Sequence, residues 1–317
     1  MKILVVPTIR ENSAKEFIEA WKDEADWDHI IFVEDNPNNT FKINQNESCS
    51  HCSWADIDKD FGGNSWIISR RDSAIRSYGF WKAHKMGADY IFTLDDDCRP
   101  LEKGFCEKHI NNIENTPRWE SSILGERLRG IPYFNLGSQK NIAFNMGLWQ
   151  GVPDYDSVRS LSEGIPTDFK PPTHNRIIPH GSYFPFCGMN FSFKREMTPL
   201  TYFPLMGVNS PFSRFDDIWF GIIAKKICDH LGLLISVGGP AILHERASNV
   251  LNNLVKEAPG IKENETFWEA IDEIELESDT PLICMKEVSK WLCWKHFEDT
   301  YLGKLGMAMQ LWCEFFE

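Results

Sequence analysis

The sequence of 317 residues lacks the features on which several large classes of protein depend. No apolar run approaches the eighteen or so residues that a membrane-spanning helix needs. The apolar run at residues 2–7 is too short for a secretory signal and no small-residue cleavage site follows it, so we expect a soluble, cytoplasmic protein without membrane insertion. Neither a Gly-x-Gly-x-x-Gly stretch after the first predicted strand nor a Walker P-loop is present, so nothing indicates a flavin, nicotinamide or ATP-binding fold.

Disulfide bonds and zinc sites also have little support. The nine cysteines are an odd number scattered along a long chain, which suits a reducing compartment better than a disulfide scaffold. Cys49 and Cys52 form the one close pair, and they offer half a zinc site or a redox pair. Because no second cysteine or histidine pair follows at zinc-finger spacing, we favour two free thiols in a polar loop.

Positive charge is scarce. The chain has 33 Lys and Arg against 46 Asp and Glu, a formal net charge of -13. This balance argues against nucleic acid as a partner, because neutralising a phosphate backbone needs clustered cations. An acidic protein that binds a diphosphate needs a divalent cation or a local arginine. The remaining composition, 42% hydrophobic and 25% charged, is that of an ordinary globular protein.

The first hundred residues predict alternating strands and helices. Short apolar runs predict buried strands at residues 2–7, 29–35 and 90–94. Helical spacing predicts helices at 13–27, with Ser13 as the N-cap, and at 72–86. Strand–helix alternation of this kind is typical of an α/β protein with a Rossmann-like, mostly parallel sheet flanked by helices.

The rest of the chain is less regular. Residues 40–65 are polar and predicted to be irregular, and the Gly-, Pro- and Asn-rich residues 120–185 predict a long excursion over the site. A strand at 186–193, a helix at 215–231 and a strand at 235–244 follow. We divide the chain into a catalytic domain, 1–251, and a helical C-terminal extension, 252–317. The apolar end of this extension predicts packing on the catalytic domain or on a second subunit, which leaves a homo-oligomer open.

Polar residues follow the predicted parallel strands where each strand ends. They are Thr8 and Arg10, Asp35, and the triplet Asp95–Asp97. Open parallel sheets bind ligands at the carboxyl ends of their strands, so we expect these groups to converge on one site. Mg²⁺ and Mn²⁺ prefer hard oxygen ligands and commonly use one or two carboxylates together with substrate phosphates. The triplet therefore predicts a metal bound to a diphosphate, against the alternative of an acidic turn that caps the next helix.

Two later motifs offer further candidates. Asp216 and Asp217 begin a predicted helix, where a carboxylate serves either as an N-cap or as a group facing a sugar. His244 ends the last predicted strand; a lone histidine is more often structural, but this position makes metal ligation credible. Gly188 allows a close approach of ligand to backbone and Asn190 can bind sugar hydroxyls, although a simple β-bulge explains both equally well.

Arg127 and Arg129, in the irregular excursion, are surface arginines by default. The guanidinium group nevertheless suits phosphate, because its N–H donors form a bidentate fork.

A series of motifs runs in order through roughly the first 250 residues, with a looser match in the helical tail. On these motifs the chain resembles the reversibly glycosylated polypeptides, the UDP-arabinopyranose mutases of glycosyltransferase family 75. The matching stretches are residues 6–10, 71–74, 93–98, 147–149, 152–156, 184–190, 214–219, 228–233 and 244–249.

The resemblance implies a GT-A-like fold, a Mn²⁺ or Mg²⁺ cofactor and a flavin-independent mutase. Such an enzyme interconverts the pyranose and furanose forms of a nucleotide-linked sugar, UDP-L-arabinose by family default, with a GDP-sugar left open. Arg129, in the stretch Arg129–Pro132, takes the position of the family's reversibly glycosylated arginine. A second family arginine falls at Leu136, so this chain lacks it. Since arginine stays protonated, it is a poor nucleophile, and Arg129 is also a candidate for holding the departing diphosphate.

The candidate site therefore has four parts. The metal ligands are Asp95, Asp97 and His244. The catalytic candidates are Arg129, Asp216 and Asp217. The sugar-binding candidates are Trp149, Gly188, Asn190 and Trp219. The nucleotide-binding candidates are Thr8, Arg10, Asp35, Arg71, Asp72 and Asp96. Two other functions remain open: a glycosyltransferase that passes the sugar to an acceptor, and a non-catalytic subunit that binds a sugar nucleotide.

Overall fold

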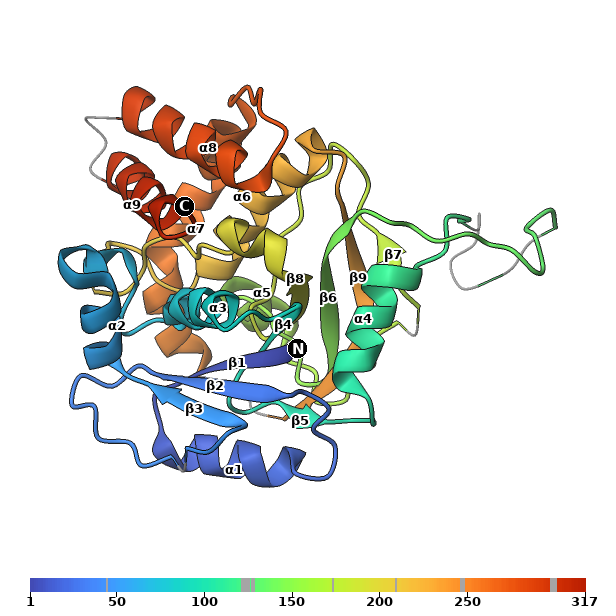
Figure 1. Ribbon diagram of the computed structural model, residues 1–317, viewed down its shortest axis with the longest axis horizontal. Helices are drawn as coiled ribbons and strands as arrows, with labels where there is room; N and C mark the ends of the chain where they lie inside the picture. The colour runs from blue at the N-terminus through green and yellow to red at the C-terminus, as the bar shows by residue number, and fades with distance from the viewer. Residues whose placement is uncertain are drawn as a thin grey trace.

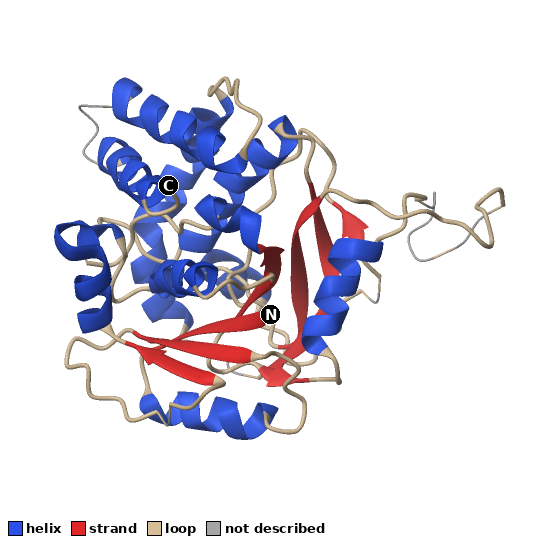
Figure 2. Ribbon diagram, viewed as in Figure 1, coloured by secondary structure: helices blue, strands red, loops and turns tan. Residues whose placement is uncertain are grey.

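The fold is a single mixed sheet between helices, with a cluster of helices at one side (Figures 1 and 2). We describe it from a computed structural model, for residues 1–43, 45–120, 126, 129–172, 174–208, 210–245, 249–296 and 301–317. The strand order is β3-β2-β1-β4-β8-β6-β9-β5, with β7 paired to β9. The expected α/β class, with helices flanking a sheet and a helical C-terminal part, is confirmed.

The N-terminal half of the sheet is parallel, as expected. It consists of β1 (Lys2–Thr8), β2 (His29–Glu34), β3 (Cys49–Cys52) and β4 (Tyr90–Leu94). β1 lies between β2 and β4, and these three central strands are almost wholly buried, which explains their continuous apolar sequences. Their carboxyl ends consequently lie at the same edge of the sheet.

The second half of the sheet is mixed. β8 (Asn190–Lys194) is antiparallel to both β4 and β6 (Ile142–Gly151), and β6 is parallel to β9 (Leu234–His244). β6 and β9 therefore run in the same direction as β4, and their carboxyl ends lie at the same edge as those of β1 and β2. The short strands β5 (Arg99–Pro100) and β7 (Arg176–Ile177) both pair antiparallel with β9.

Helices cover both faces of the sheet. On one face, α1 (Glu11–Trp21) and α4 (Phe105–Asn115) meet through the rings of Trp21 and Phe105, 5.4 Å apart. On the other face, α3 (Arg76–Lys85) and α6 (Asp216–His230) share an aromatic core, in which Phe203 contacts both Phe80 and Phe220. This face carries the helix N-termini that reach the site.

The C-terminal helices pack on the rest of the chain. α7 (Val250–Asp272) contacts α5 (Ser157–Glu163) and α6, while α8 (Pro281–Lys295) and α9 (Leu302–Glu314) pack on each other. α8 and α9 also contact the 3₁₀ segments η3 (Arg195–Leu200) and η1 (Gly62–Ile67), and α2 (Trp54–Phe61) lies next to η1. Trp312 is fully buried and donates to the Pro199 carbonyl oxygen. The division at residue 251 falls inside the first turn of α7 and stays a prediction.

Four local predictions were wrong. The first helix begins at Glu11 and ends at Trp21, and Arg10 rather than Ser13 is its N-cap. Residues 40–65 contain β3 and α2, so Cys49 and Cys52 lie in an edge strand as buried, free thiols rather than in a loop. The strand predicted at 186–193 is shorter and starts at Asn190.

The fourth error concerns the irregular excursion predicted at 120–185. It contains the ten-residue strand β6, in which a buried polar residue, Asn145, interrupts the apolar sequence pattern of a strand. The structure explains this asparagine, because it is bonded to His109 and Ser236.

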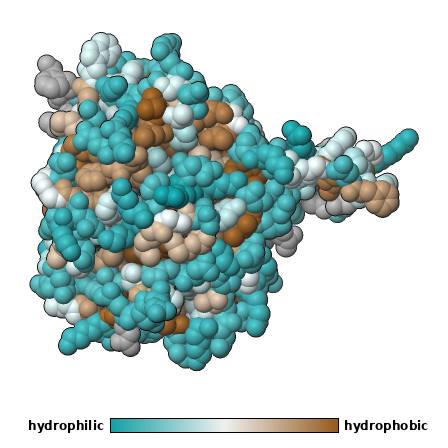
Figure 3. Space-filling view, viewed as in Figure 1, coloured by the Kyte–Doolittle hydropathy of each residue, from teal (hydrophilic) through white to brown (hydrophobic). Residues whose placement is uncertain are grey.

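A segment between α4 and β6 projects from the body (Figure 1). Its described part carries two strongly exposed aromatic residues, Tyr133 and Phe134. Polar residues cover most of the face in Figure 3, and apolar patches gather over the C-terminal helices. Among the described residues, no helix has the length and hydropathy that crossing a membrane requires.

Candidate functional site

A cavity of about 650 Å³ opens where the three parallel strands end. Thr8 closes β1, Asp35 follows β2 and Asp95–Asp97 follow β4, and all of them line this cavity as expected. Arg10, Arg71 and Asp72 line it too. The structure thus brings together all six residues predicted to bind the nucleotide.

A second cavity, of about 700 Å³, adjoins the first. Its own walls include Trp149, Asp154, Cys187, Asp217 and His244. The residues that line both cavities form a common wall: Arg10, Ser73, Arg76, Asp95, Asp97 and Arg214. Two compartments that meet at a wall of three arginines and two aspartates can hold the two halves of one elongated ligand.

Arg76 fixes the first carboxylate of the triplet. It lies in the first turn of α3, its side chain is 1% exposed, and it donates to Asp95 Oδ1 at 2.6 Å. It also donates to the Ser73 carbonyl, the Thr93 hydroxyl and the Gly188 carbonyl. A side chain at Gly188 would press on this guanidinium, since an added Cβ would lie 3.2 Å from Arg76 Cζ. The missing side chain of Gly188 therefore makes room for Arg76.

Both carboxylate oxygens of Asp96 have partners within the protein. Its Oδ2 accepts a hydrogen bond of 2.6 Å from the Thr8 hydroxyl, and its Oδ1 lies 3.5 Å from Arg10 Nη2. Burial raises the pKa of Asp96, opposed by the bond from Thr8. Thr8, Arg10 and Asp96 therefore form one structural unit that ties β1 to the triplet.

Two carboxylates, Asp35 and Asp72, hold the loop before α3. Asp35 accepts the backbone N–H groups of Arg71 and Asp72, and burial raises its pKa. Asp72 in turn accepts from the Ser213 hydroxyl and the backbone N–H of Arg214. Burial, and next the nearby charge of Asp216, raises the pKa of Asp72 to about 7.

Asp216 and Asp217 lie at the N-terminus of α6, but neither is its N-cap. The N-cap position is occupied by Phe215, but Asp217 Oδ1 accepts the first-turn backbone N–H of Ile218 at 2.9 Å, so this carboxylate also supports the helix N-terminus. Asp216 accepts from the Ser73 hydroxyl at 2.8 Å, and Asp217 accepts from the Gly188 backbone N–H at 2.7 Å. Burial raises the pKa of both; the nearby Arg76 opposes this for Asp216, whereas the charges of Asp216 and Asp154 raise the pKa of Asp217 further.

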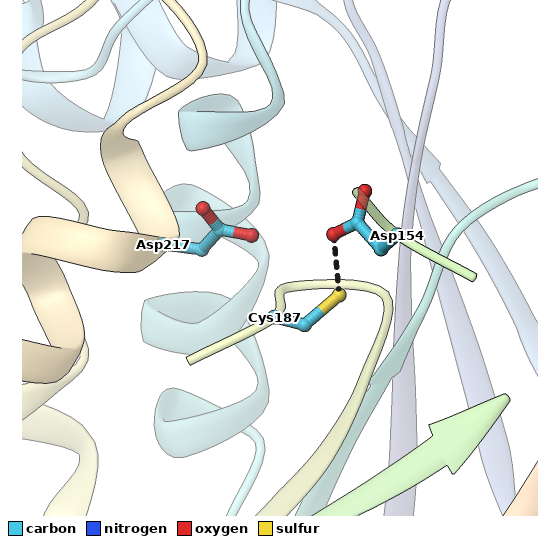
Figure 4. Close-up of side chains that lie close together, drawn as sticks. All are labelled: Asp154, Cys187 and Asp217. Carbon is cyan, nitrogen blue, oxygen red and sulfur yellow. Dashed lines mark hydrogen bonds between the residues drawn. The ribbon is translucent and has the colours of Figure 1, made fainter. Parts of the chain in front are cut away.

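Asp217 also belongs to a compact group with Asp154 and Cys187 (Figure 4). The three side chains come from α6, the loop after β6 and the loop before β8, and one ligand atom of each lies within 4.8 Å of the others. The Cys187 thiol donates to Asp154 Oδ2 at 3.0 Å, and burial raises the pKa of this thiol well above its usual value. Among the described residues, this is the group of three side chains close enough to share one ion.

The predicted metal ligands line one cavity without forming such a group. Asp95, Asp97 and His244 all face the second cavity. His244 Nδ1 lies 2.8 Å from the Val152 carbonyl oxygen, which makes Nδ1 the protonated nitrogen and leaves Nε2 as the acceptor. Two carboxylates beside a diphosphate are a sufficient protein contribution for Mg²⁺ or Mn²⁺, so Asp95 and Asp97 fit such an ion.

Comparison with known proteins decides the family. A model of the family described as reversibly glycosylated polypeptide matches residues 2–317. The chain belongs to this family. It is 35% identical over 330 residues to UDP-arabinopyranose mutase 1 of Arabidopsis thaliana, covering 98% of this chain and 90% of the relative. It is 33% identical over 335 residues to UDP-arabinopyranose mutase 1 of Oryza sativa subsp. japonica, covering 98% and 89%.

A structural likeness is much weaker. Mannosyl-3-phosphoglycerate synthase from Rubrobacter xylanophilus aligns with a TM-score of 0.43 and 11% identity, over 88% of this chain and 77% of that one. This likeness is too low to support a conclusion about fold or function.

Several residues expected to act in the site lie outside the two cavities. Trp219 is fully buried, stacks on Phe267 and donates to Asn264. Asn190 is fully buried, and its amide group is bonded to His109 and to the carbonyl oxygens of Leu148 and Pro240. Neither side chain is placed to contact a sugar in the cavities, because each completes the core.

Of the two candidate arginines in the excursion, Arg129 is among the described residues. It is exposed in a turn between α4 and β6 and lines neither cavity. Arg127 lies outside the described residues. Of the sugar-binding candidates, Trp149 at the end of β6 does line the second cavity.

The sequence did not single out several side chains of this family member's cavities. They are Ser73, Arg76, Asp154, Cys187, Arg214 and Glu257. All of these residues except Glu257 lie in or near a family motif, so the motifs could have indicated them. The motifs concerned are residues 71–74, 152–156, 184–190 and 214–219.

Proposed function

We propose that this chain is a nucleotide-sugar mutase that interconverts the pyranose and furanose forms of a nucleoside-diphosphate sugar. The observation that carries the proposal is the likeness to proteins named UDP-arabinopyranose mutase over 98% of the chain. UDP-L-arabinose is accordingly the first substrate to test. The two adjoining cavities support the proposal, because they provide one compartment for a nucleoside and another for a sugar.

The first cavity would hold the nucleoside and the second the sugar. Thr8, Asp35 and Arg71 line only the nucleoside side, whereas Trp149 and Asp217 line only the sugar side. Asp95 and Asp97 lie on the common wall, where they would hold Mn²⁺ or Mg²⁺ against the diphosphate. A bound divalent ion would neutralise the charge that builds on the departing nucleotide.

Proton transfer is assigned to Asp217. Opening one ring and closing the other requires a proton to leave the hydroxyl that closes the new ring and a proton to reach the oxygen released from the old ring. Asp217 can carry out both transfers in turn, since burial and the neighbouring carboxylates raise its pKa and so favour a held proton. The same protonated forms of Asp217 and Cys187 bind metals poorly, so we assign this group to proton transfer rather than to a second ion.

Asp216 and Trp149 would support the sugar. Asp216 receives the Ser73 hydroxyl and lies near Arg76, which favours its ionised form and would stabilise positive charge at the anomeric carbon. Trp149 offers an apolar surface to the ring. Exclusion of water by the surrounding walls would limit hydrolysis of the reactive intermediate.

The test is an incubation of the purified protein with UDP-arabinopyranose and Mn²⁺, and in parallel with a panel of GDP-sugars, with products resolved by chromatography. The proposal predicts a furanose product that disappears when EDTA is added. Asp95→Asn should remove this activity while the circular dichroism spectrum stays unchanged. The matched control is Arg195→Gln, because Arg195 is exposed at the start of η3, at the opposite edge of the sheet.

Three outcomes would contradict the proposal. Sugar nucleotide consumed only when an acceptor is present would instead indicate a glycosyltransferase. Tight nucleotide binding without any isomerisation would indicate a binding subunit. Full activity in Asp95→Asn, with or without metal, would place the site elsewhere.

A further inference from the structure

The common wall between the two cavities needs a cation with free hydrogen-bond donors. A ligand that extends from one cavity into the other must pass this wall with its diphosphate, beside the carboxylates of Asp95 and Asp97. Three arginines belong to the wall: Arg10, Arg76 and Arg214. Fixed positive charge here would offset both the phosphates and the acidic side chains.

The three arginines are held to different extents. Arg76 is buried and uses its guanidinium for four bonds within the protein. Arg10 has one long ion pair, from Nη2 to Asp96 at 3.5 Å, and among the described residues its Nε has no hydrogen-bond partner. Arg214 differs from both, because a short hydrogen bond of 2.8 Å from its Nε to Glu257 Oε1 holds the side chain in place. Within the described part of the chain, the structure gives the two terminal nitrogens of Arg214 no hydrogen-bond partner, and its side chain is 37% exposed.

The backbone of Arg214 is held in a costly conformation. Its φ is 67°, in the left-handed region that favours glycine, and Arg71 in the first cavity has a φ of 59°. This conformation is strained for any residue that carries a Cβ atom. The conformation is fixed by Asp72, which accepts from the Arg214 backbone N–H and the Ser213 hydroxyl. Both positions therefore carry an arginine side chain although their backbone conformation favours glycine.

The orientation of Arg214 comes from the C-terminal helices. Glu257 lies on α7, is 4% exposed, and also accepts from the backbone N–H and the hydroxyl of Ser157. Three donors thus fix its carboxylate, and the carboxylate fixes the guanidinium through Nε. The contact to Glu257 uses only Nε, and a guanidinium can bind a phosphate through two parallel N–H donors of its remaining nitrogens.

We propose that Arg214 binds the diphosphate of the sugar nucleotide at the junction of the cavities, and that Glu257 is its positioning residue. The inference rests on the proposed function for the identity of the ligand. It gives the role of holding the departing diphosphate to Arg214 and not to Arg129, which lies on the projecting segment. It also makes α7 part of the site, although Glu257 lies within the predicted C-terminal extension.

The test compares the binding of UDP and UMP by titration calorimetry in the presence of Mn²⁺, with GDP and GMP as a second pair. Arg214→Gly suits the left-handed backbone and removes the guanidinium. We expect it to weaken UDP binding about 10- to 100-fold, the usual loss for charge-assisted bonds, and UMP binding less than about 3-fold. Arg214→Lys, which keeps the charge but not the fork, should give an intermediate loss.

Glu257→Gln separates positioning from mere structural support. It should lower the ratio of UDP to UMP affinity about 3- to 10-fold, a change that a general loss of stability would not produce. Arg195→Gln is the matched control and should bind both nucleotides like the wild type.

Unchanged UDP binding in a folded Arg214→Gly or Arg214→Lys variant would overturn the assignment, as would an equal loss for UDP and UMP. If the wild type binds neither UDP nor GDP, the proposed function itself fails. If the wild type binds UDP but does not isomerise UDP-arabinopyranose, the mutase proposal fails, while the comparison of variants still decides whether Arg214 holds the diphosphate.

Discussion

The buried pair of Arg76 and Asp95 allows a quantitative test of the site's architecture. Arg76→Met keeps much of the side-chain volume but removes four hydrogen bonds, one of them to a carboxylate. Breaking a buried ion pair by removing one partner typically costs about 3–5 kcal/mol, because the other partner is left uncompensated. Asp95 is 33% exposed, so water can solvate part of its charge, and we expect a loss near the lower end of that range.

A double-mutant cycle isolates the contact itself. Asp95→Asn removes the charge that Arg76→Met leaves unpaired, so the double variant should be more stable than the sum of the single losses predicts, by about 1–2 kcal/mol. The assay is urea unfolding followed by the fluorescence of the 12 tryptophans. Arg195→Gln, an exposed arginine, should change the free energy of unfolding by less than about 0.5 kcal/mol. A loss below about 1 kcal/mol in Arg76→Met, or additive losses in the cycle, would refute the reasoning.

Three further predictions concern stability. The pKa of Asp72 is about 7 in the folded protein and near 4 in the unfolded chain, so the free energy of unfolding falls as the pH rises from about 4 to about 7. Asp72→Asn should therefore reduce the difference between the urea midpoints measured at pH 5 and pH 8. Burial lowers the pKa of His109 to about 3, so only the unfolded chain takes up this proton as the pH drops below about 6.5, and the folded protein loses stability. His109→Gln should therefore make the urea midpoint depend less on pH below about 6.5. Gly260→Val should lower the free energy of unfolding by about 1–3 kcal/mol, because a Cβ at this position would lie 2.3 Å from the Phe215 ring. Gly63 has open space around it, so Gly63→Ala should change the thermal midpoint little.

The sequence predicted β1, β2 and β4 of the parallel half of the sheet because these strands are buried on both faces. The continuous apolar runs of β1, β2 and β4 reflect this burial, and the polar residue after each run marks its carboxyl end. The strands that were missed carry mixed sequences for identifiable reasons. β6 contains Asn145, which serves an internal hydrogen-bond network with His109, and β3 is an edge strand of four residues that includes His51 bonded to Glu34.

The predicted site residues that line the cavities are mainly those whose position along a strand decides their exposure. Thr8, Asp35 and the triplet follow strands whose register forces them to one edge. Trp219 and Asn190 were chosen for their chemistry, but their side chains complete the core. Residue type alone does not reveal whether a tryptophan or an asparagine is already fully bonded within the fold.

The contact between Arg214 and Glu257 could not be predicted from spacing, since it joins a loop residue before α6 to a residue of α7 that lies 43 positions further along the chain. Gly260 gives the physical reason for the contact: in α7 it lets Phe215 pack against the helix, and Phe215 directly follows Arg214. The same helix turn therefore places Phe215 through Gly260 and the guanidinium through Glu257. A helical extension that merely covered the sheet would tolerate Glu257→Gln with no change in the preference for UDP over UMP, so the affinity ratio distinguishes a covering role from a role in the site.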